Sequence, residues 1–562
     1  MQALARTLGQ RLQTRPAFAF ERLAIVSAAI VVAVLVGYPI VSAFGAFRPQ
    51  ALSQLAGQEQ LVPLGNSLLL AVLTVIPATA IAVPLAWLCA RTDLPGRRVI
   101  VLLVSISFVL PILLSAIAYV FLFGRNAGLV NTWFSGMLGG PLYNIYSFSG
   151  VVLVSVLHAF PLVYFTTLAG ISNVNPELEE AGRICGLSPV QVFVRITAGA
   201  ITPSIMAGVA FAVAETLTTL SGPLVLGLPV GIRFVTTELY SSVVMTPNLS
   251  GALVTSLPLV GATLIVLALQ AWIVGDAGSS RFSTVSGKGV RAEIVRLGRW
   301  KPLAVAFAWM PILLALIVPV LTLLAAALMQ HWWKGLSIEN LTLANFVFLF
   351  HDEATRLAMR NSVLVGLGVA AVLTVAGGIL AILLAGEQTL LKRAVRNLCM
   401  VPLGLPHVVA GLLVILAWYG PPFNLGGTIW IVALGYGLVL LSYAVKTGEA
   451  ARGQIDRSLG EAAQVIGCSP LQAWWHVVLP LMRQGLVTIF LLVFLFAIKE
   501  FPLTAMVYTA DTLTLAVRIY GFLEGGSYEK TAAASMVLLA LTFLSLVVAA
   551  KVFGLKASSL RV

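Results

Sequence analysis

The clearest chemical pattern in this sequence is a polar loop that occurs twice. Residues 180–189 read EAGRICGLSP and residues 461–470 read EAAQVIGCSP, so a glutamate, a glycine and a Ser-Pro pair recur at the same spacing. Glycine favours the left-handed position that ends a helix, and Ser-Pro favours the start of the next helix. We therefore expect each loop to fold as two short helices joined by a tight turn.

The pattern assigns a matching set of candidate residues to the two loops. These are Glu180, Ala181, Gly186, Ser188 and Pro189 in the first loop, and Glu461, Ala462, Ala463, Gly467, Ser469, Pro470, Leu479 and Pro480 in the second. Asn175 and Asp456 are expected to cap the first helix of each loop with their side-chain oxygens. One such loop could simply connect two helices, but equal spacing in two copies indicates a shared role.

Ionisable residues within or beside apolar runs form a second group of candidates. Glu215, Lys499 and Glu500 could line a path or form a gate. Helix packing explains Glu215 equally well, and Lys499 and Glu500 could form an interfacial pair. Glu238 and Arg518 occupy similar places near the ends of the two halves, and we expect them to meet at an outer mouth.

Other kinds of site chemistry have little support. His158 and His407 are flanked by apolar residues and proline, and they are expected to be satisfied core histidines rather than metal ligands or a proton relay. The sequence contains no GxxxxGK[ST] phosphate-binding loop, no nucleophile motif and no cluster with metal-ligand spacing. We therefore expect no catalytic residue, metal or cofactor in this chain.

The composition places these residues in a membrane protein. The chain has 562 residues, of which 59% are hydrophobic and only 10% charged, with a mean hydropathy of +1.00. Many apolar runs exceed about 18 residues, enough to cross roughly 30 Å of hydrocarbon as a helix. The net charge of +13 does not indicate nucleic-acid binding, because the basic residues lie mostly in short loops between apolar runs.

The runs predict an all-α integral membrane protein with about 12 transmembrane helices. Most of the 34 basic residues fall in loops on one side if the N-terminus is inside. The positive-inside rule then places both termini and both polar loops in the cytoplasm. The apolar run that follows the N-terminal arginines is expected to be a retained first helix rather than a cleaved signal peptide.

The two halves of the chain repeat each other in parallel. Asn66-Ser67 and Asn361-Ser362 each open an apolar run, and Pro111 and Pro406 follow at equal distances. We divide the chain into a first six-helix repeat over residues 1–275, a cytoplasmic linker over 276–301 and a second repeat over 302–562. The polar loops then occupy about 171–200 and about 447–481.

The loops resemble the EAA motif of type I ABC importer permeases, in which Glu-Ala-Ala is followed by a glycine and then by Leu-Pro. Glu461-Ala462-Ala463, Gly467 and Leu479-Pro480 follow this pattern. The first copy has Gly182 for the second alanine and Ala198-Gly199 in place of Leu-Pro, so its loop is expected to be less well braced.

The resemblance implies a fused permease of the bacterial inner membrane, with two parallel six-helix repeats of the type I ABC importer fold. It implies two copies of a separate ABC ATPase that bind ATP and receive the loops, and an extracytoplasmic substrate-binding protein. Nucleic acid is not an expected partner. The segment from Asp511 to Tyr520 resembles ferric-iron permeases, so ferric iron is the first expected cargo. Thiamine, 2-aminoethylphosphonate and a polyamine are the other candidates.

One segment of the sequence also fits a second class of transporter. Residues 91–98 read RTDLPGRR and resemble part of the gating motif of major-facilitator transporters, which also have twelve spans in two parallel halves. That resemblance implies a carrier driven by an ion gradient. The segment lacks the glycine that precedes the aspartate in that motif, and that family does not supply two EAA loops.

Overall fold

The fold is helical throughout the part of the chain that the computed structural model describes, which is residues 22–50, 57–125, 127–278, 294–386 and 388–552. Within these ranges, nine helices are long and apolar enough to cross a membrane. The count rises to 12 if each of three sharply bent helix pairs is one span. The expected all-α membrane architecture is therefore confirmed.

The helices form two compact units, and neither unit coincides with one sequence repeat. Unit 2 comprises the described parts of residues 48–353 and 517–539. Unit 1 comprises the described parts of residues 1–47, 354–516 and 540–555. With the division into repeats expected from the sequence, unit 1 contains the first span of the first repeat, and unit 2 contains the first span of the second repeat.

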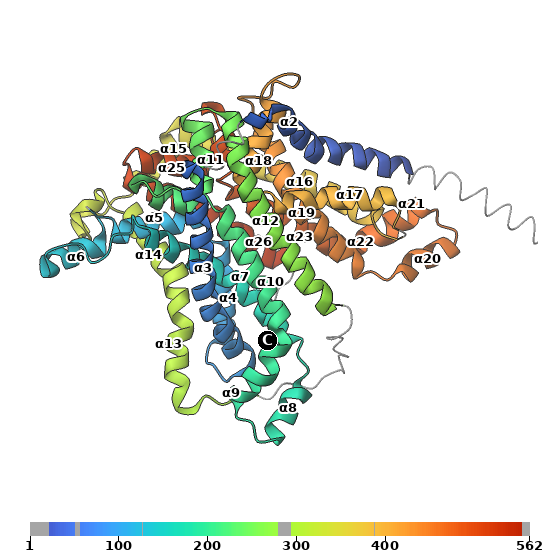
Figure 1. The fold of residues 1–562 in the computed structure, drawn as a ribbon, viewed down its shortest axis with the longest axis horizontal. Helices are drawn as coiled ribbons and strands as arrows, with labels where there is room; N and C mark the ends of the chain where they lie inside the picture. Colours follow the sequence, from blue (N-terminus) through green and yellow to red (C-terminus); the bar gives the residue numbers. More distant parts are fainter. Residues whose placement is uncertain (1–21, 51–56, 126, 279–293, 387, 553–562) are drawn as a thin grey trace, which may run out of the picture. The chain divides into compact units, whose positions relative to one another are not determined.

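Unit 2 is organised around α7 (Phe148–Ser172), which packs along α3 (Gln58–Arg91) and α10 (Ala198–Thr218). Figure 1 shows these three helices running side by side. The central position of α7 is reflected in its burial, since most of its apolar span is hidden from the surface. The remaining long helices of this unit are α4 (Arg97–Val109), α5 (Ile112–Phe123), α6 (Leu129–Leu138), α12 (Leu249–Gly278), α13 (Lys301–Ile312), α14 (Val318–Ala327) and α15 (Ala344–His351).

Unit 1 is built around α19 (Ile429–Gly453), which packs on α23 (Arg483–Ile498). The N-terminal helix that ends in α2 (Tyr38–Ala46) also belongs to this unit and contacts α18 (His407–Val414). The other helices are α16 (Glu353–Leu383), whose first residue lies in unit 2, α17 (Leu390–Met400), α24 (Thr504–Val507), the start of α25 (Leu515–Glu524) and the end of α26 (Tyr528–Val552).

Matching prolines break one span in each repeat. The chain bends by 95° between α4 and α5, at Pro111, and by 113° before α18, at Pro406. Both bends follow from proline chemistry, because the residue before a proline is pushed out of the helical region and the proline itself has no N–H to donate. Leu110 and Leu405 accordingly have extended ψ angles of 121°. This pair of breaks confirms the repeat at the level of backbone geometry.

The Asn-Ser pairs make matching hydrogen bonds in the two units. Ser67 Oγ accepts from the backbone N–H of Val235 at 3.0 Å, and Ser362 Oγ accepts from that of Leu515 at 2.8 Å. The preceding asparagines donate to backbone carbonyls nearby, Asn66 to Arg233 and Asn361 to Asp511 and Leu513. Each pair thus satisfies backbone groups where a helix has ended, which lipid cannot do.

Close packing of α16 against α19 in unit 1 generates the first prediction. A Cβ at Gly448 would lie 2.7 Å from the carbonyl oxygen of Gly377, whereas one at Gly453 would meet nothing within 4 Å. Gly448→Ala should therefore destabilise the protein by about 1–3 kcal/mol through overpacking. Gly453→Ala, on the same helix, should be neutral or slightly stabilising. Thermal unfolding in detergent measures both, and equal shifts would refute the packing argument.

Candidate functional site

The first loop folds as the sequence predicts. Helix α8 (Pro176–Ile184) begins after Asn175, whose Oδ1 accepts from the backbone N–H of Glu177 at 3.1 Å. Gly186 has φ +83° and separates α8 from α9 (Pro189–Val192). A π-helical turn over Phe193–Thr197 then leads into α10. Figure 1 shows α8 and α9 beyond the ends of α3 and α7 in unit 2.

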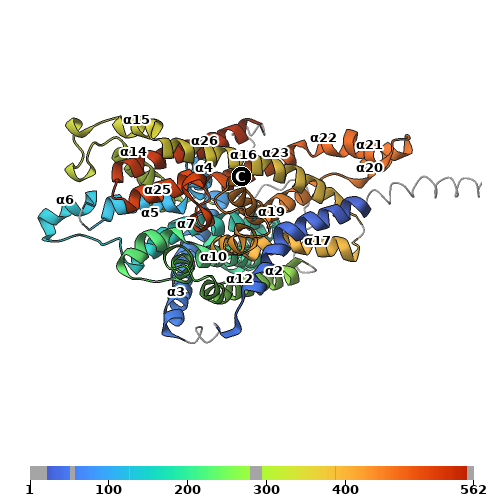
Figure 2. The ribbon, with the colours of Figure 1, turned by 90° about the horizontal axis from the view of Figure 1, so that it is seen from above.

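The second loop has the same construction in unit 1. Helix α20 (Arg457–Val465) follows Asp456, whose Oδ1 accepts from Ser458 N–H at 2.9 Å. Hydrogen bonds from the backbone and the side chain of Ser458 hold the pKa of Asp456 below its ordinary value. Gly467 has φ +98°, and α21 (Pro470–Ala473) continues into a π-helical turn over Trp474–Val478. Figure 2 shows α20 and α21 beyond the end of α23.

Matching hydrogen bonds fix the turn in each loop. The N–H of Leu187 donates to the carbonyl of Gly182 at 3.1 Å, and that of Cys468 donates to Ala463 at 3.0 Å. These bonds close the helix ends, and they require the positive φ of the glycine between them. The positive φ angle therefore explains why both turns contain a glycine, Gly186 in the first loop and Gly467 in the second.

Each second helix begins with a reciprocal capping box that the sequence analysis missed. Ser188 N–H donates to Gln191 Oε1 at 2.9 Å, and Gln191 N–H donates back to Ser188 Oγ at 3.3 Å. Ser469 and Gln472 repeat this exchange at 2.9 and 3.2 Å. The signal was present in the sequence as Ser-x-x-Gln in both loops.

Large apolar side chains are exposed around both turns. In the first loop Ile184 is 87% exposed, and in the second Val465 and Ile466 are 86% and 82% exposed. Val190 and Trp475, on the following helices, are also exposed. Exposed apolar residues on a polar, firmly capped loop indicate a surface that another protein can cover.

A compensating pair explains why the first copy departs from Glu-Ala-Ala. A Cβ on Gly182 would lie 2.5 Å from Ile196 Cδ1. At the equivalent places the second loop has Ala463, which is buried, and the shorter Val477. The two loops thus keep the packed volume nearly constant by exchanging one methyl group between helices.

The first loop is braced by a buried ion pair. Arg91 Nε lies 3.0 Å from Glu179 Oε2, with both side chains less than a tenth exposed. Glu179 Oε1 also accepts from Thr197 Oγ1 at 2.7 Å, and Arg91 donates to the Ile171 carbonyl at 2.9 Å. The loop is therefore fastened to the end of α3 without a Leu-Pro step. This brace is not predicted from the sequence, because its residues lie far apart in the chain.

The segment that resembled a major-facilitator motif has a structural role in unit 2. Asp93 Oδ2 lies 2.7 Å from Lys301 Nζ, and its Oδ1 accepts from Leu297 N–H at 2.9 Å. These contacts hold the pKa of Asp93 below its ordinary value. Thr92 also forms an isolated parallel bridge with Val295. The loop after α3 thus joins the first polar loop, through Arg91, to the chain that enters α13.

The second loop is braced by apolar packing instead. Val478 and Met482 form a buried cluster with Ala381 at the end of α16. Leu479 and Pro480 lie in the short helix α22 (Leu479–Leu481), after which the chain bends by 56° into α23. The Leu-Pro step therefore marks a bend in the second copy, whereas the first copy continues from Val190 to Thr218 as one span.

Glu500 and His407 meet where two helices of unit 1 are broken. His407 Nδ1 lies 2.8 Å from Glu500 Oε2, and Glu500 Oε1 accepts from the backbone N–H of Leu503 at 3.0 Å. The Glu500 side chain is 7% exposed and that of His407 is 32% exposed. The sequence placed both residues in an apolar setting but did not pair them. A buried carboxylate at a helix break is a candidate gate or pathway group.

The other ionisable candidates also have partners. Glu215 Oε1 lies 3.7 Å from His158 Nε2. Glu238 pairs with Arg233 at 3.4 Å, and Arg518 pairs with Asp352 at 2.9 Å. Lys499 lies over the ring of Phe496. The proposed contact between Glu238 and Arg518 stays a prediction, as do the pathway roles of these residues. Among the described residues, no three His, Cys, Asp or Glu side chains gather as a metal site.

The repeated loops and broken spans define a duplicated transport permease, and comparison with known proteins agrees. The chain belongs to the family of binding-protein-dependent transport system inner membrane components, which matches residues 82–277 and again residues 377–554. The duplication expected from the sequence is thereby confirmed. The chain is a fused double permease of this family and a multi-pass inner-membrane protein.

Individual relatives cover one or both halves. A ferric transport system permease protein of Actinobacillus pleuropneumoniae is 24% identical over 92% of this chain and 76% of its own length. A putative ferric permease of Haemophilus influenzae is 24% identical over 83% of this chain and 73% of its own length. A putative 2-aminoethylphosphonate permease of Salmonella paratyphi A is 26% identical over 40% of this chain and 85% of its own.

The exchange between Gly182 and Ile196 can be tested by a double-mutant cycle. Gly182→Ala should forfeit most of the about 1 kcal/mol that alanine normally gains over glycine in a helix interior, because the new methyl group forces the terminal Cδ1 of Ile196 aside. Adding Ile196→Val should restore that gain, since the pair then matches Ala463 and Val477. Thermal unfolding of the four proteins gives the coupling. Strictly additive effects would show that the two side chains do not compete for space.

The contact between His407 and Glu500 makes a separate prediction. His407→Ala leaves a buried carboxylate with a backbone donor alone and should cost about 3 kcal/mol. Glu500→Gln should cost less, because an amide oxygen can still accept from Leu503. In the background of His407→Ala, Glu500→Gln should lower the free energy of unfolding by about 1–3 kcal/mol less than it does in the wild-type protein. Denaturant unfolding in detergent measures the cycle, and a coupling near zero would contradict the pair.

Proposed function

We propose that this chain forms the transmembrane pathway of an ATP-driven importer that receives its solute from an extracytoplasmic binding protein. The observation that carries this proposal is the pair of matching loops, each firmly capped and each exposing apolar side chains at its turn. Such a loop suits docking into a groove of another protein. The two copies call for two ATPase subunits, which would bind the ATP.

The loops are proposed to face the cytoplasm, together with both termini. The positive-inside bias of the sequence supports this orientation. Glu180 and Glu461 then lie on the surface that the ATPases approach, and Gly186 and Gly467 form the turns that enter the grooves. Closure of the ATPases on ATP would draw the two loops together, and the helices attached to them would change the accessibility of the pathway.

The braces explain how such movement could reach the spans. In unit 2, Glu179 of α8 is tied by a buried ion pair to Arg91 at the end of α3. In unit 1, the turn after α21 packs through Val478 and Met482 on the end of α16. Each loop would therefore move as one body with a long helix, rather than as a flexible connector.

Ferric iron is the proposed cargo. Two ferric transport permeases align with most of this chain, including both halves. The 2-aminoethylphosphonate permease aligns with less than half of it. A translocation path does not need a tight metal site, because strong binding would slow release of the cargo. Thiamine and a polyamine are the alternative cargoes.

The rival proposal, an ion-gradient carrier of the major-facilitator type, loses its main support. Its motif-like residues Arg91 and Asp93 are engaged by Glu179 and Lys301 in unit 2. The rival also gives no reason for a second loop with the same caps. The importer proposal accounts for both features.

Co-purification with the partner ATPase tests the proposal. Gly467→Val should abolish the complex, because a β-branched residue cannot adopt φ +98° without strain. Gly467→Asn is the matched control, since asparagine tolerates this region and should retain the complex. Glu461→Lys should also weaken the complex by reversing a charge on the docking surface.

Reconstitution separates the two transporter classes. Liposomes containing the chain, the ATPase and the binding protein should take up ferric iron only with ATP. Uptake by the chain alone under a proton gradient would overturn the proposal. ATP-dependent uptake of another solute, but not of ferric iron, would contradict only the proposed cargo and leave the class of transporter standing.

A further inference from the structure

A pocket at one end of unit 2 has no role in the function described above. It is lined by Val120, Phe121, Gly124, Arg125, Ala127, Tyr146, Trp332 and Tyr528, and its volume is about 100 Å³. Tyr146 lies two residues before the start of α7, whereas the first loop follows the end of that helix. The pocket therefore lies at the opposite end of α7 from α8. In the proposed orientation it faces outward.

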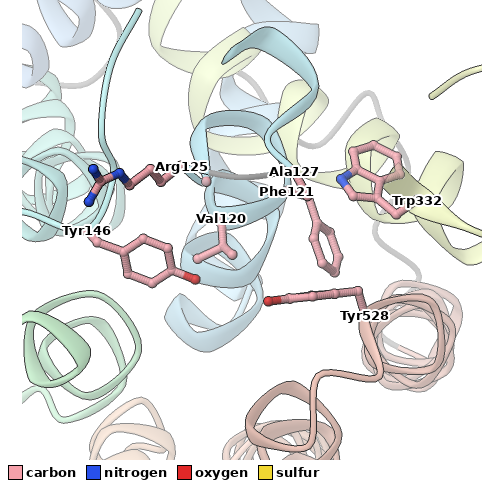
Figure 3. A pocket seen from close by; sticks show the side chains of 8 residues that line it. Val120, Phe121, Arg125, Ala127, Tyr146, Trp332 and Tyr528 are labelled. Carbon is pink, nitrogen blue, oxygen red and sulfur yellow. The ribbon is translucent and has the colours of Figure 1, made fainter. Parts of the chain in front are cut away.

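One buried polar group of the pocket is a hydrogen-bond donor that has no acceptor in the described part of the protein. Trp332 is 3% exposed, and its indole Nε1 is buried with no hydrogen-bond partner. An unsatisfied buried donor is unfavourable, so a ligand with acceptor oxygens would be stabilised here. Figure 3 shows the hydroxyls of Tyr146 and Tyr528 pointing into the same space. Arg125, which is exposed, adds a guanidinium at the rim.

The electrostatic setting favours an acceptor that carries negative charge. Burial, and secondarily the neighbouring Tyr528, raise the pKa of Tyr146 to about 12, so its phenol stays a neutral donor. The nearest carboxylate along the chain, Glu529, accepts from the backbone N–H of Trp332 at 2.6 Å and does not line the pocket. Arg125 therefore supplies the formal charge of the lining.

The shape of the pocket suits a phosphate group. Side chains that can donate line the pocket on two sides, Tyr146 and Arg125 on one and Trp332 and Tyr528 on the other, which suits a group with several acceptor oxygens. The volume leaves room for several water molecules, and therefore for a group of the size of one phosphate. Arginine is the side chain that best pairs with phosphate oxygens. Val120, Phe121 and Ala127 add an apolar wall that a phosphodiester can contact with its ester carbons.

We propose that this pocket binds a phosphate group at the outward end of unit 2. Two sources share that chemistry, the headgroup of a membrane lipid and a free phosphate ion. Phe121 packs against both Trp332, with ring centroids 5.6 Å apart, and Tyr528, at 5.8 Å. Occupancy would therefore fasten α5 to the start of α26 and to the chain that follows α14.

Binding to the purified full-length chain in detergent tests the proposal. The probes are inorganic phosphate and a short-chain phosphatidylglycerol, with dissociation constants measured by thermal shift. Arg125→Gln and Trp332→Phe should each weaken binding about tenfold, because each removes one donor. Trp333→Phe is the matched control, since Trp333 is adjacent and 68% exposed, and its binding should be unchanged.

The outcomes are distinct. Binding of the lipid but not of inorganic phosphate assigns the pocket to a headgroup, and the reverse assigns it to a free anion. If Trp332→Phe does not fold, Tyr146→Phe and Arg125→Gln carry the test. Absence of saturable binding by either probe overturns the proposal. The proposal is also wrong if Trp333→Phe weakens probe binding as much as Trp332→Phe does. It is wrong as well if Arg125→Gln leaves the affinity for the probe unchanged.

Discussion

The constraint on which the rest of this structure depends is that backbone N–H and C=O groups cannot remain unpaired in lipid. Long helices meet it along most of the chain, and the difficult places are the breaks. Pro111 and Pro406 end helices at sharp bends. Elsewhere in the chain, Ser67 and Ser362 supply acceptors to the first N–H groups of α11 (Val235–Tyr240) and α25. Side chains from another helix thus complete the hydrogen bonding at helix starts.

The same logic governs the two polar loops. A helix end leaves donors and acceptors free, and here serine, glutamine, asparagine and aspartate satisfy them at matching positions. Since the polar groups are satisfied internally, the apolar side chains around Gly186 and Gly467 can be presented without loosening the loop. The caps thus keep each loop rigid while its apolar side chains stay exposed.

Sequence reasoning was most successful where the physics is local. The caps, the left-handed glycines and the proline breaks follow from residue types over a few positions, and the two-fold repetition of Asn-Ser and proline identified the duplication. Long-range pairs were missed. Arg91 and Glu179 are distant in sequence, as are His407 and Glu500, and no period marks such contacts. The absence of Leu-Pro from the first loop predicts a weak brace, but the structure supplies one from Arg91 at the end of α3.

The composition of the two units gives a physical reason for fusing the repeats. α13 and α14 come from the second repeat but pack on α4 and α5 in unit 2, while the N-terminal helix packs on α18 in unit 1. With the division into repeats expected from the sequence, each repeat places its first span among helices of the other repeat. The pairing of Asp93 with Lys301, and the bridge from Thr92 to Val295, secure α13 to the base of the first loop. A single chain keeps these exchanged helices at high effective concentration, so each unit can recruit the helix that its own repeat does not supply.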